Sequence, residues 1–150
     1  MKDINKTMYA GIVGTSVMTA FSYAISGGHK KNFREPELLG ILMERLSQKQ
    51  GRWIRLAGWP LHYTLGLVWA GVYIFWLKAA NKNLGFKYAT MFGCCSGAVA
   101  IVIWRLLFKL HPHPPKIFYK QFFAQLFIAH IIFSLSVSTT YGALKGNKRA

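Results

Sequence analysis

The chain has 150 residues, 53% of them hydrophobic, and it carries 19 Lys and Arg against only 4 Asp and Glu. Its basic residues lie in short segments between long apolar runs, a distribution typical of charge that flanks membrane spans and binds anionic lipid headgroups. Because the apolar runs leave no soluble core for a groove-reading fold, we expect membrane lipids, and no nucleic acid, as partners.

Four apolar stretches divide the sequence, and each is 20 to 23 residues long. A helix needs about 20 residues to cross the hydrocarbon of a bilayer, and the alternation that a closed barrel requires is absent. The sequence therefore predicts an all-α polytopic membrane protein, with residues 1–150 forming a single domain of four transmembrane helices. These helices are expected at about 7–26, 57–77, 88–108 and 122–144.

The first apolar stretch, "TMYAGIVGTSVMTAFSYAIS", ends in a small-residue pattern similar to a signal-peptide cleavage site. Its apolar length exceeds the roughly 7–15 residues of a signal-peptide core, so we expect a retained span. Small residues allow helices to approach closely in lipid. Those expected at helix contacts are Gly11, Thr15, Gly66, Gly93, Gly97 and Ser134.

Between the first two spans, the segment "EPELLGILMERLSQ" has the pattern of a short amphipathic helix. Pro36 suits a first helical position, and the leucines cover one broad face while Glu37 and Glu44 share the opposite one. The apolar length is too short to cross a bilayer. We therefore predict an interfacial helix at about 36–48, in addition to the bundle of four transmembrane helices.

Two histidines occupy similar positions in the second and fourth spans. His62 and His130 are each followed by a small residue at +4 and a tyrosine at +11, positions that share one helical face. These residues are Gly66 and Tyr73 after His62, and Ser134 and Tyr141 after His130. The pattern suggests a two-fold repeat of helical hairpins, and we expect the two imidazoles to face each other inside the bundle.

Four spans would bring every histidine, together with Glu35, Glu37 and Glu44, to one membrane face. Ionisable groups inside a span usually face the bundle interior, so we predict a polar site at this mouth of the bundle. Its candidate residues are His62, His130, Tyr73, Tyr141, Glu37, Glu44 and Arg105. We expect Glu37 or Glu44 to fold over the mouth and orient a ring, whereas Arg105 either snorkels to the surface or pairs with Glu44.

Metal binding at this site is a weaker expectation. His62 and His130 could hold a transition metal with nearby carboxylates, and the "HPHPP" segment adds His111 and His113 as candidates. The alternative for that segment is a stiff, extended turn, because proline disfavours helix at its own and the preceding position.

The C-terminal half resembles a known family. "GCCSGAVAIVIWRLLFKLHPHPP" followed by "AHIIFSLSVSTTYGALKG" is similar to the YagU-type family of small bacterial inner-membrane proteins, and "LHYTLGLVWAGVY" resembles that family's other His-led span. The likeness covers about two-thirds of the chain and departs in a shorter, cysteine-free first loop. It implies a bacterial inner-membrane location and draws attention to His62 and His130, and it implies no reaction.

Three hypotheses for function follow from these observations. The first is a small membrane protein whose His-containing polar site binds or moves an ion, a proton or a metal. The second is a structural or accessory subunit, in a homo-oligomer or a larger membrane complex, that lacks chemistry of its own. The third is an electron carrier with haem held from two sides by histidine. No phosphate loop, nucleophile elbow or zinc-type spacing is present, so we expect no enzyme activity.

Overall fold

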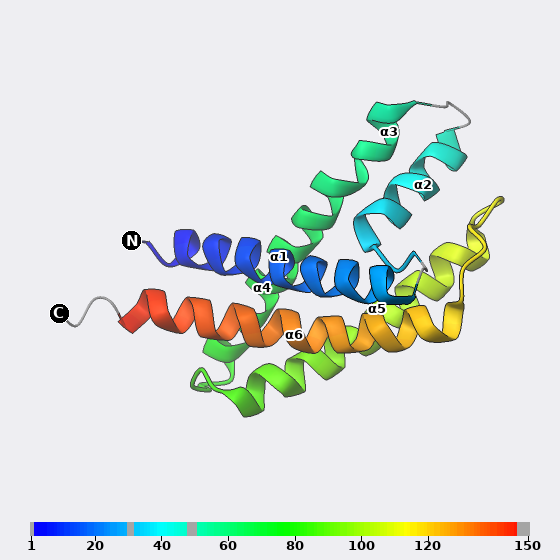
Figure 1. Ribbon diagram of the computed structural model, residues 1–150. Coiled ribbons are helices and arrows are strands. Elements are labelled where there is room, and N and C mark those ends of the chain that lie inside the picture. The colour runs from blue at the N-terminus through cyan, green and yellow to red at the C-terminus, as the bar shows by residue number, and fades with distance from the viewer. Residues whose placement is uncertain (1, 30–31, 48–50, 147–150) are drawn as a thin grey trace.

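The structure is a computed structural model that describes residues 2–29, 32–47 and 51–146, and it contains six helices within them (Figure 1). They are α1 (Asp3–His29), α2 (Glu35–Ser47), α3 (Arg52–Leu56), α4 (Gly58–Ala79), α5 (Phe86–Leu110) and α6 (Tyr119–Gly146). The described part of the chain contains no strand, which confirms the all-α prediction.

Four helical segments within the described ranges are long and apolar enough to cross a membrane. They are Asp3–Gly28, Arg52–Ala79, Phe86–Leu110 and Tyr119–Gly146, and they confirm the four predicted spans. Each starts earlier and ends later than predicted, because helical hydrogen bonding continues into polar flanks that an apolar run leaves out. The second segment joins the short α3 to α4. These features make the chain an integral membrane protein.

The bundle is built on an antiparallel pair, α1 and α6, that lie side by side along their lengths (Figure 1). α4 also packs on α1, and α5 packs on α6. Small residues allow these approaches: a Cβ on Gly66 would collide with Thr15 Oγ1, and a Cβ on Gly93 would lie 2.6 Å from Ile131 Cα. Glycine is therefore required at both crossings.

The other predicted packing residues also lie at helix contacts. A Cβ on Gly11 would meet Leu67 of α4 at 3.0 Å, and a Cβ on Gly97 would meet Phe127 of α6 at 3.1 Å. Ser134 is fully buried on α6, against Gly93 of α5.

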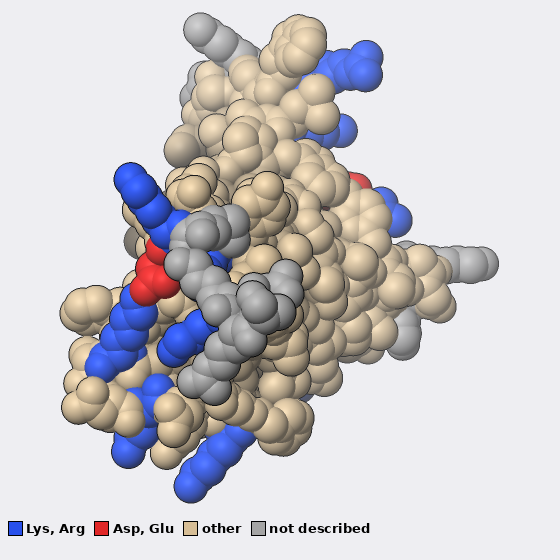
Figure 2. All heavy atoms as spheres, turned by 90° about the vertical axis from the view of Figure 1, so that its left-hand side faces the viewer, with Lys and Arg blue, Asp and Glu red and all other residues tan. Residues whose placement is uncertain are grey.

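The start of α1, the end of α4 and the end of α6 lie at one end of the molecule (Figure 1). There Lys78 Nζ on α4 lies 2.9 Å from a carboxylate oxygen of Asp3 on α1. Figure 2 shows this end: most Lys and Arg side chains in view gather at the lower left, a few more lie at the upper right, and the surface between them is mostly uncharged. Charge at the ends of helices and apolar flanks between them is the arrangement that a bilayer requires.

α4 and α5 meet at their connection and then diverge (Figure 1). Near the connection they share an aromatic cluster, in which the ring of Phe92 lies 4.9 Å from that of Tyr73 and 6.1 Å from that of Trp76. Beyond it their backbones separate, whereas α1 and α6 stay in close contact. In a two-fold repeat, the axis would exchange the hairpin α1–α4 with the hairpin α5–α6. The contact between α1 and α6 would then have an equally close counterpart between α5 and α4. The suggested two-fold repeat is therefore absent from the packing, because matching histidine offsets do not fix helix partners.

α2 forms where the short amphipathic helix is predicted, although residue 48 of the predicted range lies outside the described residues. α2 packs on α3 and α4, and its leucine face is also buried: Leu38, only 1% exposed, lies beside Pro114 and Pro115, and Leu39 faces α4 and α5. The contact is close because Gly40 faces the backbone of Arg55 and Gly58 faces the backbone of Pro36. The apolar side of α2 therefore faces protein, and this contact fixes the position of its first residue, Glu35.

Candidate functional site

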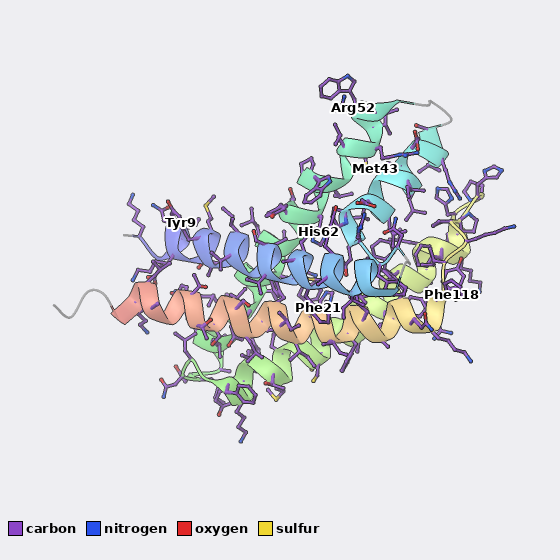
Figure 3. The ribbon with its side chains drawn as sticks, in the orientation of Figure 1. Tyr9, Phe21, Met43, Arg52, His62 and Phe118 are labelled. Carbon is purple, nitrogen blue, oxygen red and sulfur yellow. The ribbon has the colours of Figure 1, made fainter. Side chains whose placement is uncertain are left out.

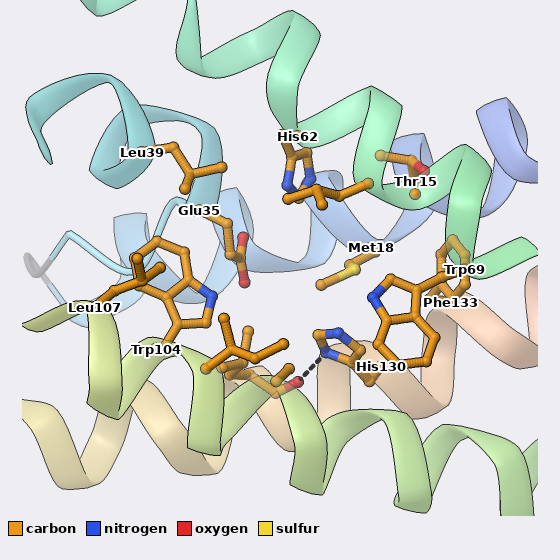
Figure 4. A pocket seen from close by; sticks show the side chains of 15 residues that line it. Thr15, Met18, Glu35, Leu39, His62, Trp69, Trp104, Leu107, His130 and Phe133 are labelled. Carbon is orange, nitrogen blue, oxygen red and sulfur yellow. Dashed lines mark hydrogen bonds between the residues drawn. The ribbon is translucent and has the colours of Figure 1, made fainter. Parts of the chain in front are cut away.

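A cavity of about 110 Å³ lies among α1, α2, α4, α5 and α6, and we call it the central cavity (Figure 4). Most of its lining is apolar, with side chains such as Met18, Leu126 and Phe133. Its ionisable lining residues are Glu35, His62 and His130. A concave apolar pocket with a few converging polar groups is the usual form of a small-ligand site.

His62 lies early in α4, on the side that faces α1 (Figure 3), and only 7% of it is exposed. Its Nε2 lies 3.0 Å from Thr19 Oγ1. The Thr19 hydroxyl already donates to the carbonyl oxygen of Thr15, at 2.7 Å. Thr19 therefore accepts from His62 Nε2–H, which assigns the proton of the neutral ring to Nε2 and leaves Nδ1 with a free lone pair.

His130 reaches the same cavity from α6 and is also 7% exposed. Its Nδ1–H donates to the carbonyl oxygen of Leu126 at 2.9 Å, because a carbonyl can only accept (Figure 4). In the neutral ring Nε2 is then an acceptor, and among the described residues it has no hydrogen-bond partner. The structure thus places both predicted histidines in the wall of one cavity, each with one nitrogen protonated and one bare.

Glu35 completes the set of ionisable groups in the cavity, and it is only 2% exposed. Its Oε1 accepts hydrogen bonds from Ser22 Oγ at 2.9 Å and from Gln125 Nε2 at 3.2 Å. Its Oε2 is buried without a partner. None of the described residues that line the cavity is Lys or Arg, so no cation is present to balance a carboxylate. Burial accordingly raises the pKa of the Glu35 carboxyl from 4.5 to about 7.

The sequence prediction named other carboxylates for this role, and the structure places them elsewhere. Glu37 accepts from Tyr23 and Arg34, at 2.9 and 3.1 Å, on the side of α2 away from the cavity. Glu44 pairs with Arg55 at the protein surface, and this hydrogen bond lowers the pKa of the Glu44 carboxyl. The expectation that Glu37 or Glu44 covers the histidines is therefore wrong.

A signal for Glu35 was present in the sequence. The leucines at 38, 39 and 42 stand three, four and seven residues after Glu35, so all four side chains share one helical face. A carboxyl on the apolar face of an amphipathic helix is buried once that face packs. A helix that starts at Pro36 excludes Glu35 from this pattern.

The remaining predicted site residues lie outside the cavity. Tyr73 is fully buried in the aromatic cluster and Tyr141 is 4% exposed, both nearer the end that carries the start of α1. Arg105 is exposed on the outer side of α5 in a groove with Lys109. Glu44 forms its ion pair with Arg55, so the predicted pairing of Arg105 with Glu44 is wrong. The exposed position of Arg105 agrees with the alternative, in which its side chain snorkels to the surface.

His111 and His113 hold a turn against α2 and lie apart from the other two histidines. The main-chain N–H of His113 donates to His111 Nδ1 at 3.1 Å, so His111 Nε2–H donates to the carbonyl oxygen of Leu42 at 3.0 Å. Across residues 2–29, 32–47 and 51–146, no three His, Cys, Asp or Glu side chains are close enough to hold a metal ion. The central cavity is also well below the roughly 300–1,000 Å³ of a pocket for a drug-sized ligand, so its size gives no support to haem.

Comparison with family models, with curated proteins and with solved structures finds no match for this chain. The resemblance to the YagU-type family therefore stays a prediction, and the geometry of the central cavity carries the proposed function.

Proposed function

We propose that this integral membrane protein binds and exchanges a proton within the bilayer, at Glu35, with His62 and His130 as neighbouring proton acceptors. The observation that carries the proposal is the Oε2 atom of Glu35, which is buried, lacks a partner and belongs to a carboxyl in the wall that both imidazoles share. We place the protein in a bacterial inner membrane, as its sequence resemblance implies.

The energetics of the carboxyl favour reversible protonation. A buried carboxylate without a counter-charge is costly, and a proton removes that cost. With a pKa of about 7, Glu35 is mostly protonated below neutral pH and mostly ionised above it. Both forms are therefore populated near neutrality, which a group that takes up and releases protons requires.

The two imidazoles add two further proton acceptors to the cavity wall. Each has one N–H engaged, with Thr19 for His62 and with Leu126 for His130, and one bare nitrogen. A neutral imidazole held in this way can accept a proton at the bare nitrogen and return it. The fixed partners hold the rings in place while the proton moves.

The position of the cavity along the helices supports a role inside the membrane. Glu35 belongs to the end of the bundle opposite the start of α1, whereas Thr15, Ala100 and Phe133 lie near the middle of their helices and also line the cavity. The site therefore extends from the level of Glu35 toward the middle of the bundle.

Proton binding can be measured directly by titrating purified protein against a Glu35→Gln variant. Gln keeps an acceptor for Ser22 and removes the ionisable group, whereas Glu37→Gln changes a carboxyl outside the cavity and is the matched control. Between about pH 8 and pH 6 a single group of pKa near 7 changes its protonation by about 0.8 proton. We expect wild type and Glu37→Gln to take up that much more than Glu35→Gln.

Equal proton uptake by all three proteins would contradict the proposal. That outcome would favour the alternative of an accessory membrane subunit, in which the histidines and Glu35 only join helices.

A further inference from the structure

We propose that the central cavity takes a small apolar primary amine, bound as its ammonium ion, which enters from the lipid between α4 and α5. This inference rests on the proposed function, since it names what competes with the proton at Glu35. The observations that carry it are the hydrogen-bonding character of the cavity wall, its aromatic borders and the side on which it opens.

The ionisable groups of the wall offer acceptors. Glu35 Oε2 has no donor, and His130 Nε2 is bare because Nδ1 carries the proton. A ligand that satisfies a carboxylate and an imidazole together must bring at least two N–H or O–H donors. A primary ammonium group brings three donors and the positive charge that the carboxylate lacks, and hydrogen bonds between charged groups are the strongest of their kind.

Indole rings border the cavity from two helices. Trp69 of α4 and Trp104 of α5 both line it (Figure 4). Indole attracts cations more strongly than the other aromatic side chains do, and its own N–H is uncharged and leaves the carboxylate unbalanced. The rest of the wall is apolar, so it suits a hydrocarbon chain attached to the ammonium group. A volume of about 110 Å³ restricts that chain to a short one.

The cavity opens toward lipid. Among its lining residues only Leu65, Ile103 and Leu107 are exposed, at 44, 46 and 40%. All three lie on α4 and α5, on the stretch where these helices have diverged. Exposed leucine and isoleucine on membrane-spanning helices face hydrocarbon. A ligand dissolved in the bilayer can therefore reach the cavity without crossing the polar ends of the bundle.

Binding exchanges one cation for another at Glu35. An ammonium ion that meets the protonated carboxyl displaces its proton, so the complex contains the carboxylate and the ammonium ion and one proton leaves. The groups that face Glu35 are Ser22 of α1 and Gln125 of α6, both uncharged, with His62, His130 and Trp104 across the cavity. Among these groups only His62 keeps a bare nitrogen for the released proton, because His130 Nε2 accepts a hydrogen bond from the ammonium ion.

The test uses hexylammonium as the probe, with purified protein in nanodiscs of zwitterionic lipid, and follows heat and indole fluorescence. Hexanoate, 1-hexanol and hexyltrimethylammonium serve as matched ligands that change the charge, remove it, or remove the N–H donors. We expect saturable binding of hexylammonium alone, with about tenfold higher apparent affinity at pH 8 than at pH 6, because the ionised fraction of Glu35 changes by that factor.

Two variants locate the binding. Glu35→Gln should abolish both the binding and its pH dependence, whereas Glu37→Gln should preserve both. Ile103→Trp fills the opening between α4 and α5 without touching the carboxyl, so it should weaken hexylammonium binding at least tenfold and leave the titration of Glu35 intact. This second variant tests the inference even where Glu35→Gln fails to fold.

Equal or tighter binding of hexanoate or 1-hexanol would overturn the assignment of an amine, and unchanged binding to Ile103→Trp would overturn the lateral route. Titration of Glu35 with no saturable hexylammonium binding would end this inference while the proposed proton binding stands. Absence of any titration at Glu35 would end the proposed function itself.

Discussion

At Glu35 a single carboxyl is held at the start of α2, with one oxygen bonded to Ser22 and Gln125 and the other without a partner. At neutral pH the burial of this ionisable carboxyl lowers the stability of the folded state. A glutamine at the same position would keep an acceptor for Ser22 without that loss. Buried polar groups without partners are uncommon in native proteins and concentrate where a proton or ligand is handled.

The burial of Glu35 predicts a particular dependence of stability on pH. Its folded pKa of about 7 lies above its ordinary value of 4.5, so between these values the folded state binds more protons than the unfolded state. Stability from this group is therefore greatest below pH 4.5 and is lost as pH rises toward 7, by about 3 kcal/mol in total.

Unfolding of wild type and Glu35→Gln in mixed micelles, measured at several pH values, checks this expectation. The variant should gain stability relative to wild type by about 3 kcal/mol as pH rises from 4.5 to 8. Contributions from other groups cancel in the difference. A difference independent of pH would show that Glu35 is not buried as described.

The hydrogen bonds of the two histidines predict opposite tautomers. His62 should carry its proton on Nε2 and His130 on Nδ1, as their partners Thr19 and Leu126 require. Nitrogen-15 NMR of labelled imidazoles distinguishes the two forms. Replacing Thr19 with Val removes the acceptor of His62 and should alter the His62 signal alone. A change at His130 as large as that at His62, or identical tautomers in wild type, would contradict these assignments.

For single residues, the sequence predicts the two histidines of the site but not its carboxyl. Imidazole is costly in lipid, so placing His62 and His130 in the interior follows from their positions in apolar runs. The choice of carboxyl does not follow, because it depends on which residue begins α2. A helix that starts at Pro36 leaves out the buried Glu35, whereas Glu37 is half-buried and bonds to Tyr23 and Arg34.

Among the elements, α1 and α4 cross closely because Gly66 leaves room for Thr15, and this contact sets the distance between His62 and Thr19. Gly66→Ala adds a methyl group where Thr15 Oγ1 lies. We expect it to destabilise the protein by about 1–3 kcal/mol, as overpacking does, and to disturb the hydrogen bond of His62.

Gly71 on the same helix provides the matched control, since nothing lies within 4 Å of a Cβ added there. Gly71→Ala should be neutral or stabilising by up to about 1 kcal/mol, because alanine favours helix over glycine. Denaturant titration of the two variants in micelles measures the difference. Equal stabilities would mean that α1 and α4 do not approach as described.

Element boundaries and element partners differ in how far sequence can predict them. The four spans are predictable because a bilayer imposes their length and apolarity, residue by residue. Which helices pack together is not predictable in this way, because glycine and serine stripes such as those on α5 and α6 occur at any close crossing. The matching offsets after His62 and His130 suggested a repeat, yet packing joins α1 to α6 and separates α4 from α5.

For the whole molecule, the arrangement of the spans predicts one topology. The start of α1, the α4–α5 connection and the end of α6 share one end of the bundle, and the segment before α6 lies at the other (Figure 1). Basic residues occur at both ends, so charge alone does not set the orientation.

Cysteine labelling in intact vesicles tests that topology, with Cys94 and Cys95 first replaced by Ser. New cysteines at the exposed positions Lys2, Lys82 and Lys145 should react with a membrane-impermeant reagent from one side, and a cysteine at Lys116 from the other. Labelling of Lys2→Cys and Lys145→Cys from opposite sides would contradict four spans.

Infrared difference spectroscopy across neutral pH, on the protein in a lipid bilayer, measures the protonation of Glu35 directly and so tests the proposed proton binding. We expect a protonated-carboxyl band that disappears with a midpoint of about 7 in wild type and in Glu37→Gln, and that is absent from Glu35→Gln. A band that persists in Glu35→Gln, or a Glu35 midpoint near the ordinary value of 4.5, would contradict the proposal that this cavity binds and exchanges a proton.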